Sequence, residues 1–106
     1  METISLAEAF ERIETEKQVV LLYTLKEMSI NSTLDQICAL IDEHNKVVSI
    51  IKVLVDPEKL SREDATKLGI IRLPQLRFYG NGILLGTMTG QASPSDVYER
   101  ILSLYT

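Results

Sequence analysis

Cys38 and His44 are the side chains of this chain best suited to chemistry on a substrate, and each residue type occurs once. A cysteine thiolate can attack a disulfide, and a histidine can transfer protons near neutral pH or bind a metal ion. A single cysteine excludes an internal disulfide, and His44 has no Cys or His partner at metal-ligand spacing. The sequence therefore predicts no metal centre and no cofactor.

The position of Cys38 favours a structural role over a chemical one. It belongs to an apolar stripe with helical spacing, which also contains Leu34, Ile37 and Ile41. A cysteine buried among aliphatic side chains has a raised pKa and is unreactive. His44 falls in the last turn of the same predicted helix, where the helix dipole favours a cation. We interpret four acids as solvated charges on helix exteriors: Asp35, Asp42, Glu43 and Glu63.

Composition restricts the class of protein. The chain has 106 residues, a hydrophobic fraction of 45% and a net charge of −4. These values predict one folded domain over residues 1–106 and argue against binding to nucleic acid or to an anionic membrane surface. The sequence has no apolar run long enough to span a bilayer and no signal-peptide pattern at its start. One cysteine fits a reducing compartment, so we expect a cytoplasmic protein.

The elements that must position these residues follow from hydrophobic spacing. Capping patterns at Ser5, Ser61 and Ser93 each precede a predicted helix, and the stripe around Cys38 marks another. Continuous apolar runs at residues 19–23 and 47–55 predict strands that are covered on both faces. Two further strands are predicted on either side of residues 80–82. The order is αβαβαββα, which predicts an α/β fold with a four-stranded mixed sheet and helices on both faces.

Residues 69–82 are the most informative stretch. They read as a helix end at Gly69, a proline at Pro74, an apolar strand, and a tight turn at Gly80-Asn81-Gly82. This order and spacing resemble the proline loop and hairpin of the thioredoxin superfamily. The resemblance implies a thioredoxin-like three-layer sandwich, a cis bond at Leu73-Pro74, and pairing of an extended peptide with the backbone beside that proline.

The resemblance also shows what is missing. The superfamily's redox motif, Cys-X-X-Cys, falls on Met28-Ser29-Ile30-Asn31. The tryptophan before that motif falls on Glu27, and the buried acid of the first strand falls on Leu22. The thioether of Met28 cannot ionise or form a mixed disulfide. Cys38 lies roughly 10 Å further along the helix axis than the second motif position. We therefore expect a redox-inactive, non-catalytic domain.

The resemblance implies that three loops meet at one end of the sheet, and we expect this surface to bind a protein or peptide. Such a domain would act as an adaptor, chaperone or assembly factor. The alternative for Pro74 is that it only shapes the turn, and the alternative for Met28 and Ile30 is that they complete the core. The predicted binding residues are Glu27, Met28, Ser29, Ile30, Asn31, Leu73, Pro74, Thr89, Gly90 and Gln91.

Two other functions stay open from the sequence. One is a thiol-disulfide oxidoreductase relative with weak or partner-dependent activity, acting through Cys38 or through a second protein's cysteines. The other is a homodimer or larger oligomer formed through the strand that begins Ile83-Leu84-Leu85, which is apolar on both faces at a sheet edge. A helix and the N-terminal segment could instead cover these three residues.

Overall fold

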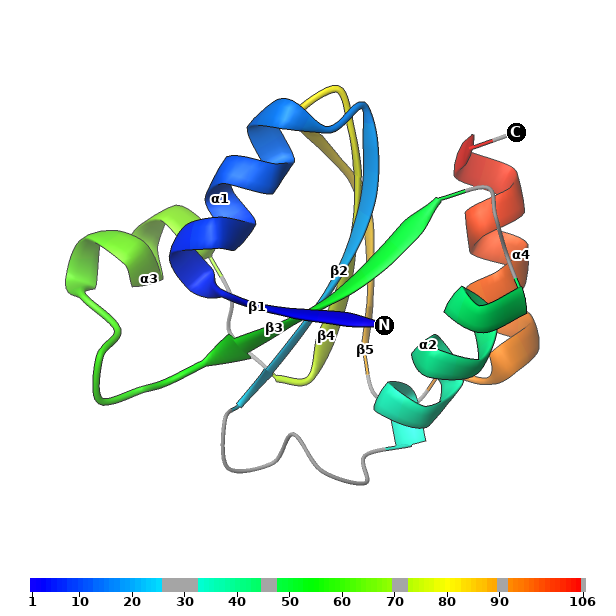
Figure 1. Ribbon diagram of the computed structural model, residues 1–106, viewed down its shortest axis with the longest axis horizontal. Helices are drawn as coiled ribbons and strands as arrows, with labels where there is room; N and C mark the ends of the chain where they lie inside the picture. Colours follow the sequence, from blue (N-terminus) through cyan, green and yellow to red (C-terminus); the bar gives the residue numbers. More distant parts are fainter. Residues whose placement is uncertain (26–32, 45–47, 70–72, 90–91, 106) are drawn as a thin grey trace.

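A computed structural model of the chain describes residues 1–25, 33–44, 48–69, 73–89 and 92–105 (Figure 1). These residues form the following elements: β1 (Glu2–Ser5), α1 (Leu6–Thr15), β2 (Gln18–Leu25), α2 (Thr33–His44), β3 (Ser49–Val55), α3 (Arg62–Leu68), β4 (Gln75–Gly80), β5 (Ile83–Thr89) and α4 (Pro94–Tyr105).

The strands form one mixed sheet in the order β1-β3-β2-β4-β5. β3 is parallel to both β1 and β2, whereas β4 is antiparallel to β2 and to β5. Figure 1 shows α1 and α3 on one face of the sheet and α2 and α4 on the other. The predicted α/β sandwich is therefore confirmed, but the predicted number of strands is wrong, because the sheet has five.

The additional strand is β1, at the edge of the sheet beside β3. It is four residues long, and only Ile4 is buried. So short a segment carries no readable alternation of apolar and polar side chains, and its strand conformation comes from pairing with β3. The pairs run from Glu2 opposite Ile51 to Ser5 opposite Leu54. This placement also puts the N-terminal segment at the opposite edge from β5, so it does not cover β5.

Three helices begin at the serines that the sequence indicated. Ser5 and Ser61 accept hydrogen bonds from the backbone N–H of the residue three positions later, and Ser93 does the same for Asp96. Each bond satisfies an N–H group that would otherwise lack a partner in the first turn. At its other end α3 ends at Gly69, whose φ of 61° lies in the left-handed region. The helix boundaries thus follow from local chemistry.

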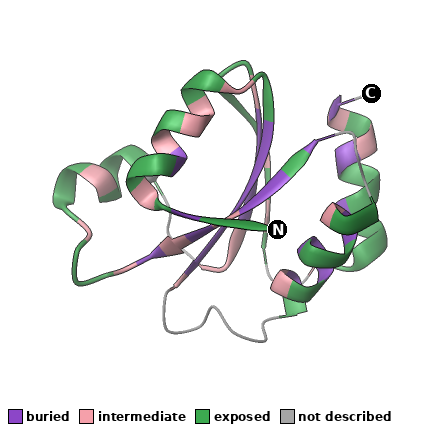
Figure 2. Cartoon of the chain, viewed as in Figure 1, coloured by how far each residue is buried: buried purple, intermediate pink, exposed green. Residues whose placement is uncertain are grey.

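The sheet separates two hydrophobic cores, and Figure 2 shows its central strands buried between the helix layers. Alternate residues of each strand face opposite cores. The core on the α1 side consists of Ile4, Ala9, Val19, Leu21, Tyr23, Ile51, Val53, Val55 and Tyr79. The core on the α2–α4 side consists of Val20, Leu22, Leu34, Ile37, Cys38, Ile41, Val48, Ile50, Leu76, Phe78, Val97, Ile101 and Tyr105.

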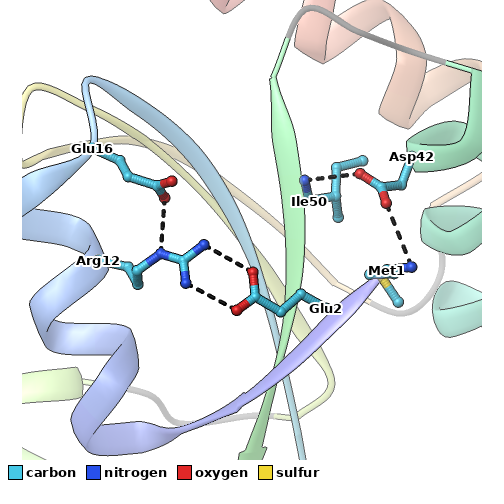
Figure 3. A network of polar contacts seen from close by, with 6 residues as sticks. All are labelled: Met1, Glu2, Arg12, Glu16, Asp42 and Ile50. Carbon is cyan, nitrogen blue, oxygen red and sulfur yellow. Dashed lines mark hydrogen bonds and ion pairs between the residues drawn. The ribbon is translucent and has the colours of Figure 1, made fainter.

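Polar contacts tie the helices to the parallel edge of the sheet (Figure 3). Arg12 of α1 donates two hydrogen bonds to the Glu2 carboxylate, at 2.9 and 3.0 Å, and its Nε lies 3.4 Å from Glu16. Asp42 of α2 accepts a hydrogen bond of 3.2 Å from the backbone N–H of Ile50.

The interpretation as solvated charges is therefore wrong for two of the four acids. Asp42 is bonded to β3, and Asp35 forms an ion pair of 3.0 Å with Lys52 of the same strand. Both side chains lie on the part of α2 that faces the sheet edge, a direction that the helical spacing alone did not reveal. Glu43 and Glu63 are exposed, as predicted.

The hairpin between β4 and β5 is closed by Asn81 and Gly82, which have φ angles of 52° and 79°. Positive φ at both central residues is typical of the tight turn that suits twisted strands. The N–H of Asn81 donates to the carbonyl of Lys17 at 2.7 Å, which fixes the turn against the α1–β2 connection. At the same end of the sheet, on the α4 face, the hydroxyl of Tyr105 donates to the carbonyl of Tyr79 at 2.9 Å.

Candidate functional site

The register of the strands gathers three segments at one end of the sheet. Tyr23, near the end of β2, pairs with Gln75 at the start of β4, and Gln75 pairs with Thr89 at the end of β5. Leu73 and Pro74 come directly before Gln75, so they lie at the same end. We call the residues Leu25, Leu73, Pro74 and Thr89 the loop end of the sheet. Three of them were predicted for the binding surface, and only Leu25 was not.

The peptide bond between Leu73 and Pro74 is cis. Leu73 is half-buried and packs against the core on the α1 side, while Pro74 is also half-buried and Thr89 is exposed. The loop end therefore combines an anchored proline segment with an accessible strand terminus. The other predicted binding residues lie outside the described residues: Glu27, Met28, Ser29, Ile30, Asn31, Gly90 and Gln91.

A buried arginine next to the loop end was missed by the sequence analysis. Arg77 of β4 has an exposed fraction of 8%. Its Nε donates to Oε1 of Gln75 at 2.7 Å, and its guanidinium carbon lies 5.7 Å from the ring centre of Tyr23. Gln75, Arg77 and Tyr79 alternate along β4 and so share one face of the sheet. That alternation of polar side chains within an apolar strand was the signal in the sequence.

Tyr23 lies in the core but has polar neighbours, Arg77 and Tyr79. Burial raises the pKa of the Tyr23 hydroxyl well above its ordinary value, the neighbouring Tyr79 raises it further, and Arg77 lowers it. Tyr23 is therefore a neutral phenol at physiological pH. It supports the start of β4 by packing and offers no base or nucleophile to a substrate.

Cys38 lies in the α2–α4 core, with an exposed fraction of 0%. The pKa of its thiol is raised to about 12, first by burial and then by the negative charges of Asp35 and Asp42. A thiol with this pKa is almost entirely protonated near pH 7, and thiol-disulfide exchange needs the thiolate. The predicted position of Cys38 in the core is thus confirmed.

The raised pKa of Cys38 predicts a dependence of stability on pH. The unfolded chain loses this proton near pH 9.0 and the folded chain near pH 12, so the thiol's contribution is complete below pH 9 and is lost as the pH rises towards 12. The free energy of unfolding should fall by up to about 1.4 kcal/mol per pH unit in this interval. Urea unfolding at pH 8, 9 and 10 measures this slope.

The matched control for the pH dependence is Cys38→Ala, which keeps Tyr23 and Tyr105 and loses only the thiol. Burial also raises the pKa of Tyr105, to about 12, so tyrosine ionisation contributes to the slope in both chains. The difference between the two slopes reports Cys38 alone. Equal slopes in the two chains would contradict a protonated thiol in the core.

Other chemistry has little support among the described residues. Within them, no group of three or more His, Cys, Asp or Glu side chains is placed to hold a metal ion. His44 lies in the last turn of α2, as the sequence predicted, and is exposed. In the described ranges no helix combines the length and the apolar character needed to cross a bilayer.

Comparison with solved structures identifies the architecture. Thioredoxin from Plasmodium falciparum superposes with a TM-score of 0.75 at 18% identity, over 98% of this chain and 99% of that chain. Chlamydomonas reinhardtii thioredoxin f2 gives 0.74 at 15% identity, over 100% and 98%. Malassezia sympodialis thioredoxin gives 0.70 at 21% identity, over 100% and 91%. No protein-family model and no curated protein matches the sequence. The chain has a thioredoxin-like fold.

Proposed function

We propose that the chain is a non-catalytic thioredoxin-fold domain that binds an extended segment of a partner protein at the loop end. The observation that carries this proposal is the separation of thiol and loop end. The chain's only cysteine lies in the α2–α4 core, whereas Leu73, Pro74 and Thr89 lie together at the end of the sheet. A chain with one cysteine cannot form the intramolecular disulfide that a dithiol reductase forms in each catalytic cycle.

Peptide binding remains available to such a surface because it needs no sulfur. An extended segment can pair its backbone with exposed backbone groups beside a strand, and its side chains then give specificity. The half-buried proline segment and the exposed Thr89 suit this mode of binding. The resemblance of the sequence to the thioredoxin superfamily adds Met28 and Ile30 to the surface, as apolar contacts for the partner.

The partner surface can be mapped with photo-crosslinking amino acids placed in two exposed positions of β5. Thr89 lies at the loop end, and Ile83 lies at the other end of the same strand. Immobilised chain is incubated with lysate of its own cell, irradiated, and the crosslinked proteins are compared. We expect one partner to crosslink at Thr89 and not at Ile83, and Met28→Asp or Ile30→Asp to abolish the crosslink while the circular dichroism spectrum is unchanged.

Crosslinking at Ile83 in place of Thr89 would indicate a second candidate function, self-association through β5. Ile83, Leu84 and Leu85 have exposed fractions of 64%, 45% and 42%, so the alternative that a helix and the N-terminal segment cover them is wrong. An uncovered apolar edge strand can pair with a second copy of the chain. Crosslinking at Ile83 alone, to another copy, would replace partner binding at the loop end by self-association.

The oxidoreductase alternative is tested in a separate assay. The purified chain should not accelerate the reduction of insulin disulfides by dithiothreitol, because Cys38 is both buried and protonated. Turnover clearly above the reductant alone would overturn the non-catalytic part of the proposal.

A further inference from the structure

A surface groove on the α1–α3 face shares no residue with the loop end, although it shares Leu84 with the β5 edge, and it has no role in the proposed binding at the loop end. Its volume is about 370 Å³, within the range of small-ligand sites in proteins. Figure 1 shows the two helices that border it on the same side of the sheet. The lining residues are Phe10, Ile13, Glu14, Lys67, Arg77, Tyr79, Gly82 and Leu84.

The bottom of the groove is rigid. Tyr79 and Arg77 are adjacent positions on one face of β4, with exposed fractions of 7% and 8%. The Nε of Arg77 is hydrogen-bonded to Gln75, which fixes the plane of its guanidinium group. At one end of the groove the β4–β5 turn is held against the α1–β2 connection through the Asn81–Lys17 hydrogen bond. A ligand would therefore meet a preformed surface, which lowers the entropy cost of binding.

The sides of the groove combine apolar surface with one accessible cation. Phe10 and Ile13 of α1 are half-buried, and Leu84 of β5 is exposed. The ammonium group of Lys67 lies 4.4 Å from the ring centre of Phe10. Among the residues that the structure describes, no carboxylate forms an ion pair with Lys67. The ammonium group thus lies near the face of an aromatic ring, which attracts cations, and Lys67 lines a groove with apolar sides.

The charge of the lining also discriminates between ligands. Two cations and one acid line the groove, in a chain whose net charge is −4. Arg77 is buried and hydrogen-bonded to Gln75, so Lys67 is the accessible cation of the lining, and an anion in the groove can pair with its ammonium group. An anion without an apolar part would leave Phe10, Ile13 and Leu84 uncovered, and a neutral apolar molecule would leave Lys67 unused.

We propose that this groove binds a small amphipathic carboxylate, with the carboxylate on Lys67 and the apolar body against Phe10, Ile13 and Leu84. Binding is separate from the loop end and does not depend on a protein partner. An arylalkyl carboxylate is the simplest compound with both parts. Its affinity for so open a site should be low, with a Kd of about 1 mM.

The test is a titration of the ¹⁵N-labelled chain with 4-phenylbutyrate and with its neutral analogue 4-phenylbutyramide, followed by amide chemical shifts. We expect saturable shifts at Phe10, Lys67 and Leu84 with the carboxylate, and a Kd about threefold to tenfold weaker with the amide. Lys67→Gln should abolish this preference. Lys59→Gln, an exposed lysine outside the groove, should preserve it.

Three results would overturn the proposal: no saturable shift in the groove, equal Kd values for the carboxylate and the amide, or the same loss of preference in Lys59→Gln. These outcomes are independent of the proposed function, because Lys67→Gln leaves the loop end intact. A chain that loses carboxylate binding and still crosslinks its partner at Thr89 has lost only the groove. Leu84→Ser provides the apolar counterpart, since it should weaken the carboxylate and the amide equally.

Discussion

Native Cys38 should react with a thiol reagent such as dithionitrobenzoate at least about 1,000-fold more slowly than Cys38 in urea, because a domain of ordinary stability exposes its core in fewer than about one molecule in a thousand. The side chain has no exposed surface, so the reagent reaches it only when the α2–α4 core opens. The raised thiol pKa adds to the effect, because closed molecules hold almost no thiolate near pH 8. The rate of absorbance change at pH 8 measures the protection.

The control for the labelling experiment is an exposed cysteine in the same protein. Ser103→Cys in a Cys38→Ala background places a thiol at an exposed position of α4, and this thiol should react at the rate of an unfolded peptide. Rapid labelling of Cys38 in the native parent chain would show that the thiol is reachable. That result would remove the main support for a non-catalytic domain and would favour exchange through Cys38.

Replacement of Phe78 by alanine should lower the free energy of unfolding by about 3–5 kcal/mol, the usual cost of deleting a buried aromatic ring. Phe78 has no exposed surface and belongs to the α2–α4 core. A loss of this size is a large fraction of the total stability of a small domain. Urea unfolding followed by circular dichroism gives the free energies of both chains.

The comparison for Phe78→Ala is Ile83→Thr, which changes another large apolar side chain, this one at the exposed edge on the neighbouring strand. Ile83 is the most exposed of the large apolar side chains at the β5 edge, with an exposed fraction of 64%, so its replacement should change stability by no more than about 0.5 kcal/mol. If Ile83→Thr destabilised a dilute, monomeric chain as strongly as Phe78→Ala does, the β5 edge would be part of the core. A loss that appears only at high protein concentration would indicate self-association.

Local chemistry made most of the fold predictable. Helix starts at Ser5, Ser61 and Ser93 and the helix end at Gly69 depend on hydrogen bonds within a few residues, which the sequence displays directly. The apolar stripe of α2 placed Cys38 in the core for the same reason. Such features are encoded within one turn of chain, so no knowledge of the tertiary structure was needed to find them.

Features that depend on distant pairing were not predictable in the same way. β1 is a strand because β3 lies beside it, and the ion pair of Asp35 exists because Lys52 projects from β3 towards α2. Each partner is separated from the other by many residues of chain. The local pattern therefore indicated a solvated charge at Asp35 and predicted no strand at residues 2–5.

In the candidate site, too, some features could be predicted from the sequence and others depend on elements that are distant in the chain. The resemblance to the thioredoxin superfamily implied that Leu73, Pro74 and Thr89 share one end of the sheet, and the register of the β4–β5 hairpin, with Gln75 opposite Thr89, places them there. The groove at Lys67 was not predictable from the sequence, because its lining comes from α1, α3, β4 and β5, which are distant in the chain. Arg77 would have been found by counting polar side chains along one face of its strand.

The two cores on opposite faces of the sheet imply an order of assembly during translation. Every buried residue of the α1-side core lies between Ile4 and Tyr79, so that layer can close before α4 has been synthesised. The other core needs Val97, Ile101 and Tyr105, and the Tyr105 hydroxyl lies 3.3 Å from the carbonyl of Val19, a residue made much earlier. A nascent chain therefore exposes Leu76 and Phe78 to the ribosome surface and to chaperones until its last helix emerges.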